Sequence, residues 1–244
     1  MDLKGKVALV TGGGRRLGKE IALALAARGA QLAVHYNHSA AQAEATVATI
    51  NGAGGRALAL HADLERVAEI RAMVARIDAE LGGLDLLINS ASVFSRKPMN
   101  EISERDWDSN FNVNLKAPFF IAQFAAPLMR RAGAGKIVNL GDLAAVRPFT
   151  DYFAYSVSKS GLVGLTRALA KALAPQVQVN CLALGPVLPP EDYPPPVLTR
   201  LAAGTLVKRL GTPQDVVNGV LLFCEGSDFV TGATLTVDGG MLLA

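Results

Sequence analysis

Apolar and polar positions along the chain follow two patterns that alternate from one end to the other. Short runs of β-branched and other apolar residues predict strands at Lys6–Thr11, Gln31–Tyr36, Arg56–His61, Leu84–Ile88, Lys136–Leu140, Val177–Leu182 and Thr234–Val237. Apolar residues at helical spacing predict helices at Leu17–Arg28, Ala40–Ile50, Glu65–Leu81, Glu104–Arg130, Phe153–Leu173 and Val216–Cys224. We therefore expect one doubly wound α/β domain, with a parallel sheet of about seven strands and helices on both faces. Pro118 and Pro127 are expected to bend the fourth helix.

A cluster of prolines follows the sixth expected strand. Six of the twelve prolines fall between Pro186 and Pro196, which excludes a central strand or a helix interior and predicts a stiff, polyproline-like loop. An interdomain linker has the same composition, but too few residues follow this one to form a second domain. Loops that leave the carboxyl ends of parallel strands are where α/β folds bind ligands. We therefore interpret residues 185–206 as a Pro-rich loop that covers the substrate.

Composition and charge narrow the classes of function. The 244 residues suffice for one α/β domain with a full core, and 50% of them are hydrophobic. The net charge is only +3, and the basic pairs are separated by apolar sequence instead of forming a stripe. We therefore expect no nucleic-acid partner.

Cysteine usage and the N-terminal residues indicate a cytoplasmic protein. Cys181 and Cys224 lie in apolar runs without metal-ligand spacing, so we expect two buried, reduced thiols and no metal site. The first residues lead into a strand without the apolar segment of a signal peptide. No apolar stretch approaches the roughly 20 residues of a membrane span, so no membrane partner is expected.

A glycine-rich turn follows the first expected strand and opens the first helix. It reads Thr-Gly-Gly-Gly-Arg-Arg-Leu-Gly over residues 11–18. Glycines at such a point permit a tight turn and the close approach of a pyrophosphate, which the helix N-terminus attracts. This context predicts a Rossmann-type dinucleotide site that uses Gly12, Arg15, Arg16, Leu17 and Gly18.

The residues after the second expected strand indicate which dinucleotide is bound. A site for unphosphorylated ribose places an acidic residue there, about twenty residues beyond the glycines. No carboxylate occurs between Glu20 and Glu44. A 2′-phosphate would therefore meet no repulsion, and NADPH or NADP+ is the expected cofactor. The predicted phosphate-binding cluster, with Arg15 or Arg16 within reach, is His35, Tyr36, Asn37, His38 and Ser39.

A tyrosine and a lysine four residues apart carry the candidate chemistry. Tyr155 and Lys159 share one face of the expected helix, so the Lys159 ammonium can lie beneath the Tyr155 phenol. A nearby cation lowers the pKa of a phenol toward working pH, as a proton-exchanging group requires. Asp142 precedes Tyr155 by thirteen residues, and its negative charge opposes ionisation of the phenol. We therefore expect Tyr155 to act as a proton donor.

Together these motifs resemble the short-chain dehydrogenase/reductase family across essentially the whole chain. The turn over residues 11–18, Tyr155, Lys159 and the sequence Val-Asp-Gly-Gly at residues 237–240 match its pattern. The resemblance implies that Asn114 holds a water which links Lys159 to solvent. It also implies cofactor contacts from Ala62, Asp63, Asn89, Ser90, Ala91, Tyr155, Lys159, Gly185, Pro186 and Val187.

Two departures from the usual pattern of that family resemble its pteridine reductase branch. Arg16 stands where most members have glycine, and Asp142 stands where most have the serine that holds a substrate carbonyl. The branch resemblance implies that Arg16 bridges the pyrophosphate and the pterin. It further implies that Phe94 stacks on the pterin ring and that Ser92 hydrogen-bonds it.

The resemblance implies an NADPH-dependent reductase that converts a dihydropterin, or dihydrofolate, to its tetrahydro form. The catalytic residues carried over are Asp142, Tyr155, Lys159 and Asn114. Two alternatives stay open. One is a general NADPH-dependent carbonyl reductase, such as a 3-oxoacyl reductase or a sugar or polyol dehydrogenase. The other is a non-catalytic NADPH-binding protein.

Members of the family are usually homotetramers, which is the assembly the resemblance implies here. A face of small residues on the expected helix over Phe153–Leu173 is compatible with close packing between subunits. Its members are Ala154, Gly161, Leu165 and Ala168.

Overall fold

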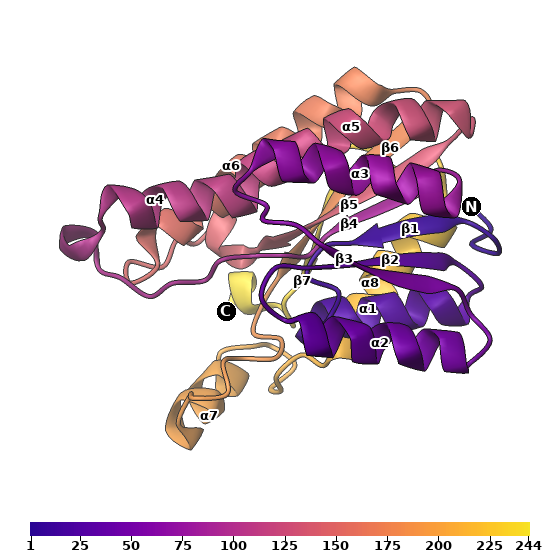
Figure 1. Cartoon of the computed structure of the whole chain (residues 1–244). Helices are drawn as coiled ribbons and strands as arrows, with labels where there is room; N and C mark the ends of the chain where they lie inside the picture. The colour runs from indigo at the N-terminus through magenta and orange to yellow at the C-terminus, as the bar shows by residue number, and fades with distance from the viewer.

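Seven parallel strands form one sheet at the centre of the molecule. A computed structural model describes all of residues 1–244. The strands are β1 (Val7–Val10), β2 (Gln31–Tyr36), β3 (Ala57–His61), β4 (Leu86–Asn89), β5 (Gly135–Asp142), β6 (Val177–Leu184) and β7 (Thr234–Val237). Their order is β3-β2-β1-β4-β5-β6-β7, and every neighbouring pair is parallel (Figure 1). The predicted doubly wound, Rossmann-type sheet is confirmed.

Helices cover both faces of this sheet (Figure 1). One face carries α1 (Arg16–Ala27), α2 (Ala40–Gly52) and α8 (Pro213–Glu225). The other carries α3 (Val67–Leu81), α4 (Glu104–Phe111), α5 (Ala117–Arg131) and α6 (Phe153–Leu173), with α4 extending beyond the edge of the sheet. Short 3₁₀ turns occur at Met99–Glu101, Leu143–Ala145 and Met241–Leu243.

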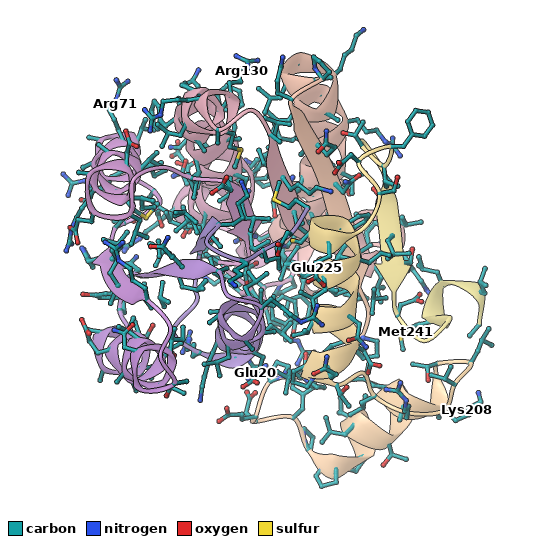
Figure 2. The ribbon with its side chains drawn as sticks, turned by 90° about the vertical axis from the view of Figure 1, so that its right-hand side faces the viewer. Glu20, Arg71, Arg130, Lys208, Glu225 and Met241 are labelled. Atoms are coloured by element: carbon teal, nitrogen blue, oxygen red, sulfur yellow. The ribbon has the colours of Figure 1, made fainter.

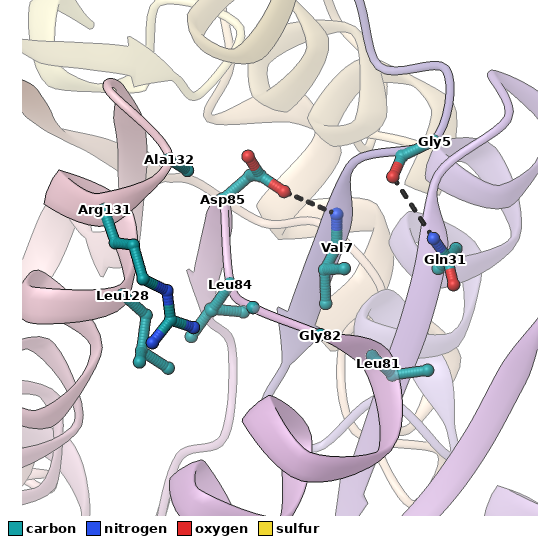
Figure 3. A pocket seen from close by; sticks show the side chains of 11 residues that line it. Gly5, Val7, Gln31, Leu81, Gly82, Leu84, Asp85, Leu128, Arg131 and Ala132 are labelled. Atoms are coloured by element: carbon teal, nitrogen blue, oxygen red, sulfur yellow. Dashed lines mark hydrogen bonds between the residues drawn. The ribbon is translucent and has the colours of Figure 1, made fainter.

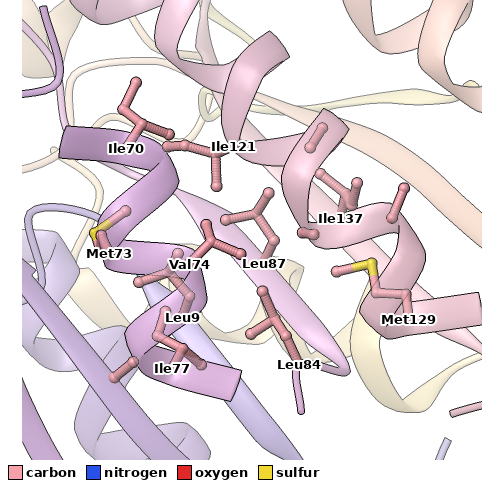
Figure 4. Close-up of a cluster of buried hydrophobic side chains, with 14 of the residues drawn as sticks. Leu9, Ile70, Met73, Val74, Ile77, Leu84, Leu87, Ile121, Met129 and Ile137 are labelled. Atoms are coloured by element: carbon pink, nitrogen blue, oxygen red, sulfur yellow. The ribbon is translucent and has the colours of Figure 1, made fainter. Parts of the chain in front are cut away.

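Aliphatic side chains hold the helices on the sheet. Ile70 and Val74 of α3 and Ile121 of α5 pack over Leu87 of β4 (Figure 4). A second cluster of the same kind lies under α1, α2 and α8. Each fully buried side chain of this type contributes roughly 2 kcal/mol. Because both faces are buried, the strands are apolar throughout, which is the pattern that the sequence shows.

The region predicted as one bent helix over Glu104–Arg130 consists of three segments. A π-helical turn, Asn112–Lys116, separates α4 from α5. Pro118 lies in the first turn of α5 and has no N–H to donate to the carbonyl four residues earlier, which explains the interruption. Turns of this kind are frequent at functional sites, and this one holds Asn114.

The prediction of a loop over residues 185–206, polyproline-like between Pro186 and Pro196, is wrong for the residues from Pro195 to Ala203. Residues 185–194 run as a loop, but α7 (Pro195–Ala203) follows at once. Pro195 and Pro196 lie in the first turn of α7, where backbone N–H groups have no partner within the helix and the fixed φ of proline suits helical geometry. The prolines therefore start a helix.

The segment from Pro186 to Gly211, here called the excursion, contains this loop and α7. It is hydrogen-bonded at both of its ends and again after α7. Gly211 N–H donates a 3.0 Å hydrogen bond to the Pro186 carbonyl, and Val187 forms an isolated bridge with Gly211. Beyond α7, Leu206 N–H donates to the Gly239 carbonyl at 2.8 Å. Figure 2 shows Lys208 and Met241 on the same side of the molecule. The excursion is thus tied to the C-terminal segment.

A shallow cavity of about 290 Å³ opens at the amino ends of the strands (Figure 3). Gly5 and Asp85 line it near β1 and β4, and Arg131 lines it from the end of α5. The Asp85 carboxylate accepts hydrogen bonds from Val7 N–H at 2.9 Å and from the Lys6 ammonium at 3.0 Å. Asp85 therefore ties the starts of β1 and β4 together.

Candidate active site

The carboxyl ends of β1, β4, β5 and β6 meet at the opposite edge of the sheet. Strand order reverses between β1 and β4, so the loops after these strands leave in opposite directions and open a crevice. Gly12, Asn89, Asp142 and Gly185 lie at or just beyond these strand ends. Residues that are far apart in sequence thus meet at the place where open α/β sheets bind ligands.

The turn after β1 requires glycine at several positions. Gly12 has a φ of +65°, in the left-handed region that favours glycine. A Cβ on Gly18 would overlap the Gly12 carbonyl oxygen, and a Cβ on Gly14 would lie 2.9 Å from the Ala43 nitrogen. The first turn of α1 carries no acidic residue. Its unpaired N–H groups and positive dipole end therefore fit an anionic pyrophosphate.

His35 does not lie on the surface with the other residues of the predicted phosphate cluster. Its side chain is 2% exposed beneath the turn, where Nδ1 accepts a 3.1 Å hydrogen bond from Gly12 N–H and Nε2 lies 3.0 Å from the Ala62 carbonyl oxygen. Burial lowers the pKa of His35 to about 4. A neutral ring whose nitrogens both bind backbone cannot contact a phosphate, so the predicted phosphate role of His35 is wrong. His35 supports the glycine turn instead.

The other members of that cluster are accessible. Tyr36, Asn37 and Ser39 are half-buried, and His38 is exposed. Arg15 is exposed at the N-cap of α1. Contact of these residues with a 2′-phosphate stays a prediction.

Thr11 joins two loops of the crevice, a role that the glycine-rich motif in which it stands did not predict. Its buried hydroxyl oxygen accepts hydrogen bonds from Ser90 N–H at 2.9 Å and Ala91 N–H at 3.0 Å. The loop after β4 is therefore fixed against the glycine turn. A threonine at the end of a β-branched strand gives no signal of this role in the sequence.

The structure brings Asp142, Tyr155 and Lys159 together. The Tyr155 phenol donates a 2.7 Å hydrogen bond to Asp142 Oδ2, and Asp142 Oδ1 accepts one of 2.7 Å from Ala144 N–H. The Lys159 ammonium lies 5.6 Å from the centre of the Tyr155 ring and donates to the Leu140 carbonyl at 2.7 Å. The phenol thus contacts a carboxylate and has an ammonium near its ring.

Burial shifts all three groups toward their neutral forms. Burial, the charge of Asp142 and the hydrogen bond to it raise the pKa of Tyr155 well above its usual value. Burial also raises the pKa of Asp142, against the opposing effects of Ala144 N–H, Tyr155 and Lys159. Burial lowers the pKa of Lys159, against the charge of Asp142. The expected lowering of the Tyr155 pKa by Lys159 is therefore wrong here, and Tyr155 is held as a protonated donor.

Asn114 is buried on the π-helical turn, and both its side-chain oxygen and its side-chain nitrogen form hydrogen bonds with protein groups. Its Oδ1 accepts from the Ser92 hydroxyl at 3.0 Å and from Val93 N–H at 2.8 Å. Its Nδ2 donates to the Val93 carbonyl and to the Ser158 hydroxyl, both at 3.0 Å. The side chain therefore clamps the loop after β4 onto α6. A water link from Asn114 to Lys159 stays a prediction.

Phe94 lies in an aromatic cluster beside Tyr155. Its ring stacks on Tyr152 at 4.2 Å and 13°, and meets the Tyr155 ring edge-on at 4.7 Å and 80°. Phe94 is nevertheless 42% exposed, so it is not a core residue and can offer a ring surface to a ligand. The Tyr152 hydroxyl lies 2.8 Å from the hydroxyl of Tyr193 in the Pro-rich loop. Tyr152 and Tyr193 are site residues that the sequence analysis missed.

Arg16 reaches the Pro-rich loop. Its guanidinium donates to the carbonyl oxygens of Leu188 and Pro189, the latter at 3.1 Å, and lies 3.7 Å from the Glu191 carboxylate. Its backbone φ of +50° is uncommon for a residue with a Cβ. Arg16 thus joins the glycine turn to the loop, and its predicted bridge between pyrophosphate and pterin stays a prediction.

Matches with known proteins extend over the whole chain. The family model described as Enoyl-(Acyl carrier protein) reductase matches residues 13–242. The 2-dehydro-3-deoxy-D-gluconate 5-dehydrogenase of Escherichia coli is 34% identical over 99% of this chain and 97% of its own length. The 3-oxoacyl-[acyl-carrier-protein] reductase FabG of Staphylococcus aureus is 33% identical over 98% of each chain. This chain belongs to the short-chain dehydrogenase/reductase family.

The similar solved structures include members of one branch of the short-chain dehydrogenases/reductases. FolM Alternative dihydrofolate reductase 1 from Brucella canis, solved with NADP, superimposes with a TM-score of 0.94 at 34% identity, covering 100% of this chain and 96% of that one. Such FolM neighbours fit the pteridine reductase-like branch. NADP or NADPH is also bound in other similar structures, in agreement with the cofactor predicted from the sequence.

The remaining cofactor residues predicted for this short-chain dehydrogenase/reductase lie along the same edge. Asn89 Nδ2 donates to Asn139 Oδ1 at 2.7 Å, while Asn89 Oδ1 has no protein partner, so its cofactor contact stays a prediction. A Cβ on Gly185 would lie 2.6 Å from the Asp238 Cα, so this position requires glycine. The residues whose cofactor contacts stay predictions are Leu17, Ala62, Asp63, Ser90, Ala91, Gly185, Pro186 and Val187.

Cys181 and Cys224 are buried and unpaired, as predicted. No three His, Cys, Asp or Glu side chains gather closely enough to hold a metal ion. None of the helices combines the length and the apolar character that crossing a membrane requires.

Proposed function

We propose that this protein is an NADPH-dependent reductase of pteridines that converts a dihydropterin, or dihydrofolate, to its tetrahydro form. The observation that carries the proposal is the 2.7 Å hydrogen bond from Tyr155 to the Asp142 carboxylate, beside the partly exposed ring of Phe94. An ionised carboxylate accepts hydrogen bonds and cannot donate one to a ketone oxygen. Pterins present N–H and amino donors together with a planar aromatic face, so they suit both Asp142 and Phe94.

NADPH fits the cofactor end of this site. The glycine turn has no room for a Cβ at Gly14 or Gly18, and the start of α1 carries no carboxylate. The segment after β2 carries none either, so residues 36–39 together with Arg15 would hold the 2′-phosphate. When bound, NADPH supplies the hydride.

Tyr155 is the proton donor of the proposed reaction. As a substrate ring carbon gains hydride, the electrons of its C=N bond move to the adjacent nitrogen, which takes the phenolic proton of Tyr155. The raised pKa keeps Tyr155 protonated until that moment. The Lys159 ammonium then stabilises the phenolate that remains, because it lies 5.6 Å from the ring centre.

Asp142 and Asn114 position the reacting groups. Ala144 N–H fixes Asp142 Oδ1, which leaves Oδ2 toward Tyr155 and the remaining lone pairs for donors of the pterin. Asn114 holds the backbone of Val93, and so positions the adjacent Phe94 as the surface on which the pterin stacks. Ser92 donates to Asn114 and retains acceptor capacity for the substrate.

A general NADPH-dependent carbonyl reductase is the second candidate, because relatives of comparable identity are named as a sugar-acid dehydrogenase and a 3-oxoacyl reductase. A carbonyl substrate needs a hydrogen-bond donor at position 142, and Asp142 donates only when it is protonated. Burial raises the pKa of Asp142. This candidate therefore predicts ketone reduction that increases as pH falls.

The proposed enzyme acts as a cytoplasmic homotetramer that packs through α6. Phe153 and Val157 are 37% and 38% exposed on this helix, beside its small-residue face. Burial of these side chains between subunits would stabilise the assembly.

The experiment that tests the proposal follows NADPH consumption by its ultraviolet absorbance. A dihydropterin and dihydrofolate are compared with an acetoacetyl thioester, and a polyol is tested with NADP+. Turnover of the pterins alone supports the proposal. Turnover of the thioester or the polyol alone would mean that Asp142, Arg16 and Phe94 are local variations on a carbonyl reductase site.

A further inference from the structure

The Pro-rich loop is held against the site at two points. Near its start, Arg16 binds the carbonyl oxygens of Leu188 and Pro189. Near its end, the hydroxyl groups of Tyr193 and Tyr152 lie 2.8 Å apart. Tyr152 is the N-cap of α6, three residues before Tyr155. The second contact therefore joins the loop to the helix that carries the proton donor.

Tyr152 is a firm anchor for this contact. Its ring stacks on Phe94, and Phe149 packs against its edge at 6.3 Å and 72°. On its N-terminal side, Lys97 N–H donates to the Asp151 carbonyl at 2.8 Å. The Tyr152 hydroxyl therefore occupies a fixed place beside Phe94, and the Tyr193 hydroxyl lies 2.8 Å from it.

We propose that the hydrogen bond between Tyr152 and Tyr193, here called the tyrosine strap, closes the Pro-rich loop over Phe94 and sets the affinity of the site for a planar substrate. The inference rests on the proposed function, because a planar ring is what Phe94 would hold. The strap fastens the loop to Tyr152, whose ring stacks on Phe94. Tyr152 and Tyr193 are therefore positioning residues that act through Phe94 and the loop.

The chemistry of the two phenols suits a permanent fastening. Burial and the hydrogen bond with Tyr193 raise the pKa of Tyr152, so its hydroxyl keeps its proton through the working pH range. Two hydroxyl groups carry two hydrogens, and the bond between them uses one. The second hydrogen can be donated to a hydrogen-bond acceptor on the substrate. The ionised Asp142 has no hydrogen to donate to such an acceptor. The strap thus adds a donor to a site whose central polar group is an acceptor.

Three variants test the strap: Tyr152→Phe, Tyr193→Phe and the double variant. Each keeps the aromatic ring and removes only a hydroxyl. The matched control is Thr199→Val, which removes a hydroxyl of α7 that donates only to the Pro195 carbonyl within its own helix. Amide hydrogen exchange over residues 187–206 and the KM for a dihydropterin are measured in all of them.

Each single variant is expected to speed exchange of the loop amides about fivefold and to raise KM by a similar factor, as the loss of one neutral hydrogen bond does. The kcat stays unchanged. In amide exchange, the double variant shows no more than the effect of one single variant, because both remove the same bond. The control exchanges at the wild-type rate over residues 187–194.

Unchanged amide exchange in Tyr193→Phe, or additive effects on amide exchange in the double variant, would overturn the proposed strap even if the pterin is turned over. If no pterin is turned over, the proposed function fails, while loop exchange still decides whether the strap exists. Equal changes in KM for a planar pterin and an acetoacetyl thioester would show that the strap does not select planar substrates.

Discussion

Gly12 N–H donates a 3.1 Å hydrogen bond to Nδ1 of His35, so the turn predicted to hold the pyrophosphate rests on a buried imidazole. The bond requires the neutral ring. The pKa of His35 falls from 6.5 to about 4 on folding. As pH falls below 6.5, the unfolded chain takes up a proton that the folded protein does not. Stability is therefore present above that pH and is lost toward pH 4, by roughly 3 kcal/mol in all.

Urea unfolding between about pH 7 and pH 4.5 measures this loss. Acidic groups also titrate in part of that range, so His35→Gln is the control. The variant lacks the titrating ring and is expected to show a shallower dependence on pH. Parallel curves for the two proteins would contradict the assignment.

Replacement of Asp142 by serine is expected to separate the two candidate reactions. Loss of the carboxylate that accepts from the pterin should lower kcat/KM for a dihydropterin by about a hundredfold. Ketone reduction should fall less, because serine can donate to a carbonyl oxygen. Removal of the Asp142 charge also lowers the pKa of Tyr155, so the alkaline limb of the pH–rate profile should move to lower pH. Equal losses on both substrates would rule out pterin selection by Asp142.

Two replacements of Arg16 distinguish backbone strain from side-chain contact. Both Arg16→Ala and Arg16→Gly lose the bonds to Leu188 and Pro189. Only glycine relieves the φ of +50°. The glycine variant should therefore be about 1 kcal/mol more stable than the alanine variant, as read from urea midpoints. If the alanine variant is the more stable one, the backbone at this position is not strained.

Gly18→Ala is expected to abolish NADPH binding, because its Cβ would overlap the Gly12 carbonyl and distort the turn. NADPH fluorescence on titration with protein measures the affinity. Gly52→Ala, at the end of α2, meets no atom within 4 Å and should bind like the wild type. Equal affinities for the two variants would show that the turn tolerates a side chain at position 18.

The parallel sheet and the placement of Tyr155 and Lys159 on one helix face followed from local patterns in the sequence. Buried parallel strands are apolar throughout, and the spacing of Tyr155 and Lys159 fixes them on one face of α6. Asp142 was placed by its spacing and a family resemblance, and it contacts Tyr155 as the last residue of β5.

The errors arose where tertiary contacts decide the direction of a side chain. His35 and His38 are three residues apart, yet His35 lies within β2, whose two faces are both covered, while His38 lies on the surface beyond the strand end. The hydrogen bonds of Arg16 to carbonyl oxygens of a loop some 170 residues away in sequence could not be predicted either, because no local pattern records such a contact. Proline suggested a loop at 195 and 196, although the first turn of a helix tolerates it equally.

The pairing of Val187 with Gly211 has a consequence for how such a site changes over evolutionary time. In this pairing the chain leaves and rejoins the body of the protein at adjacent positions. Residues 188–210 therefore form an inserted segment with fixed ends, here called the cassette. Exchange of the cassette between relatives should transplant substrate preference without redesign of the sheet. Arg16 and Tyr152, which lie outside the cassette and bind its loop through their side chains, would be exchanged with it.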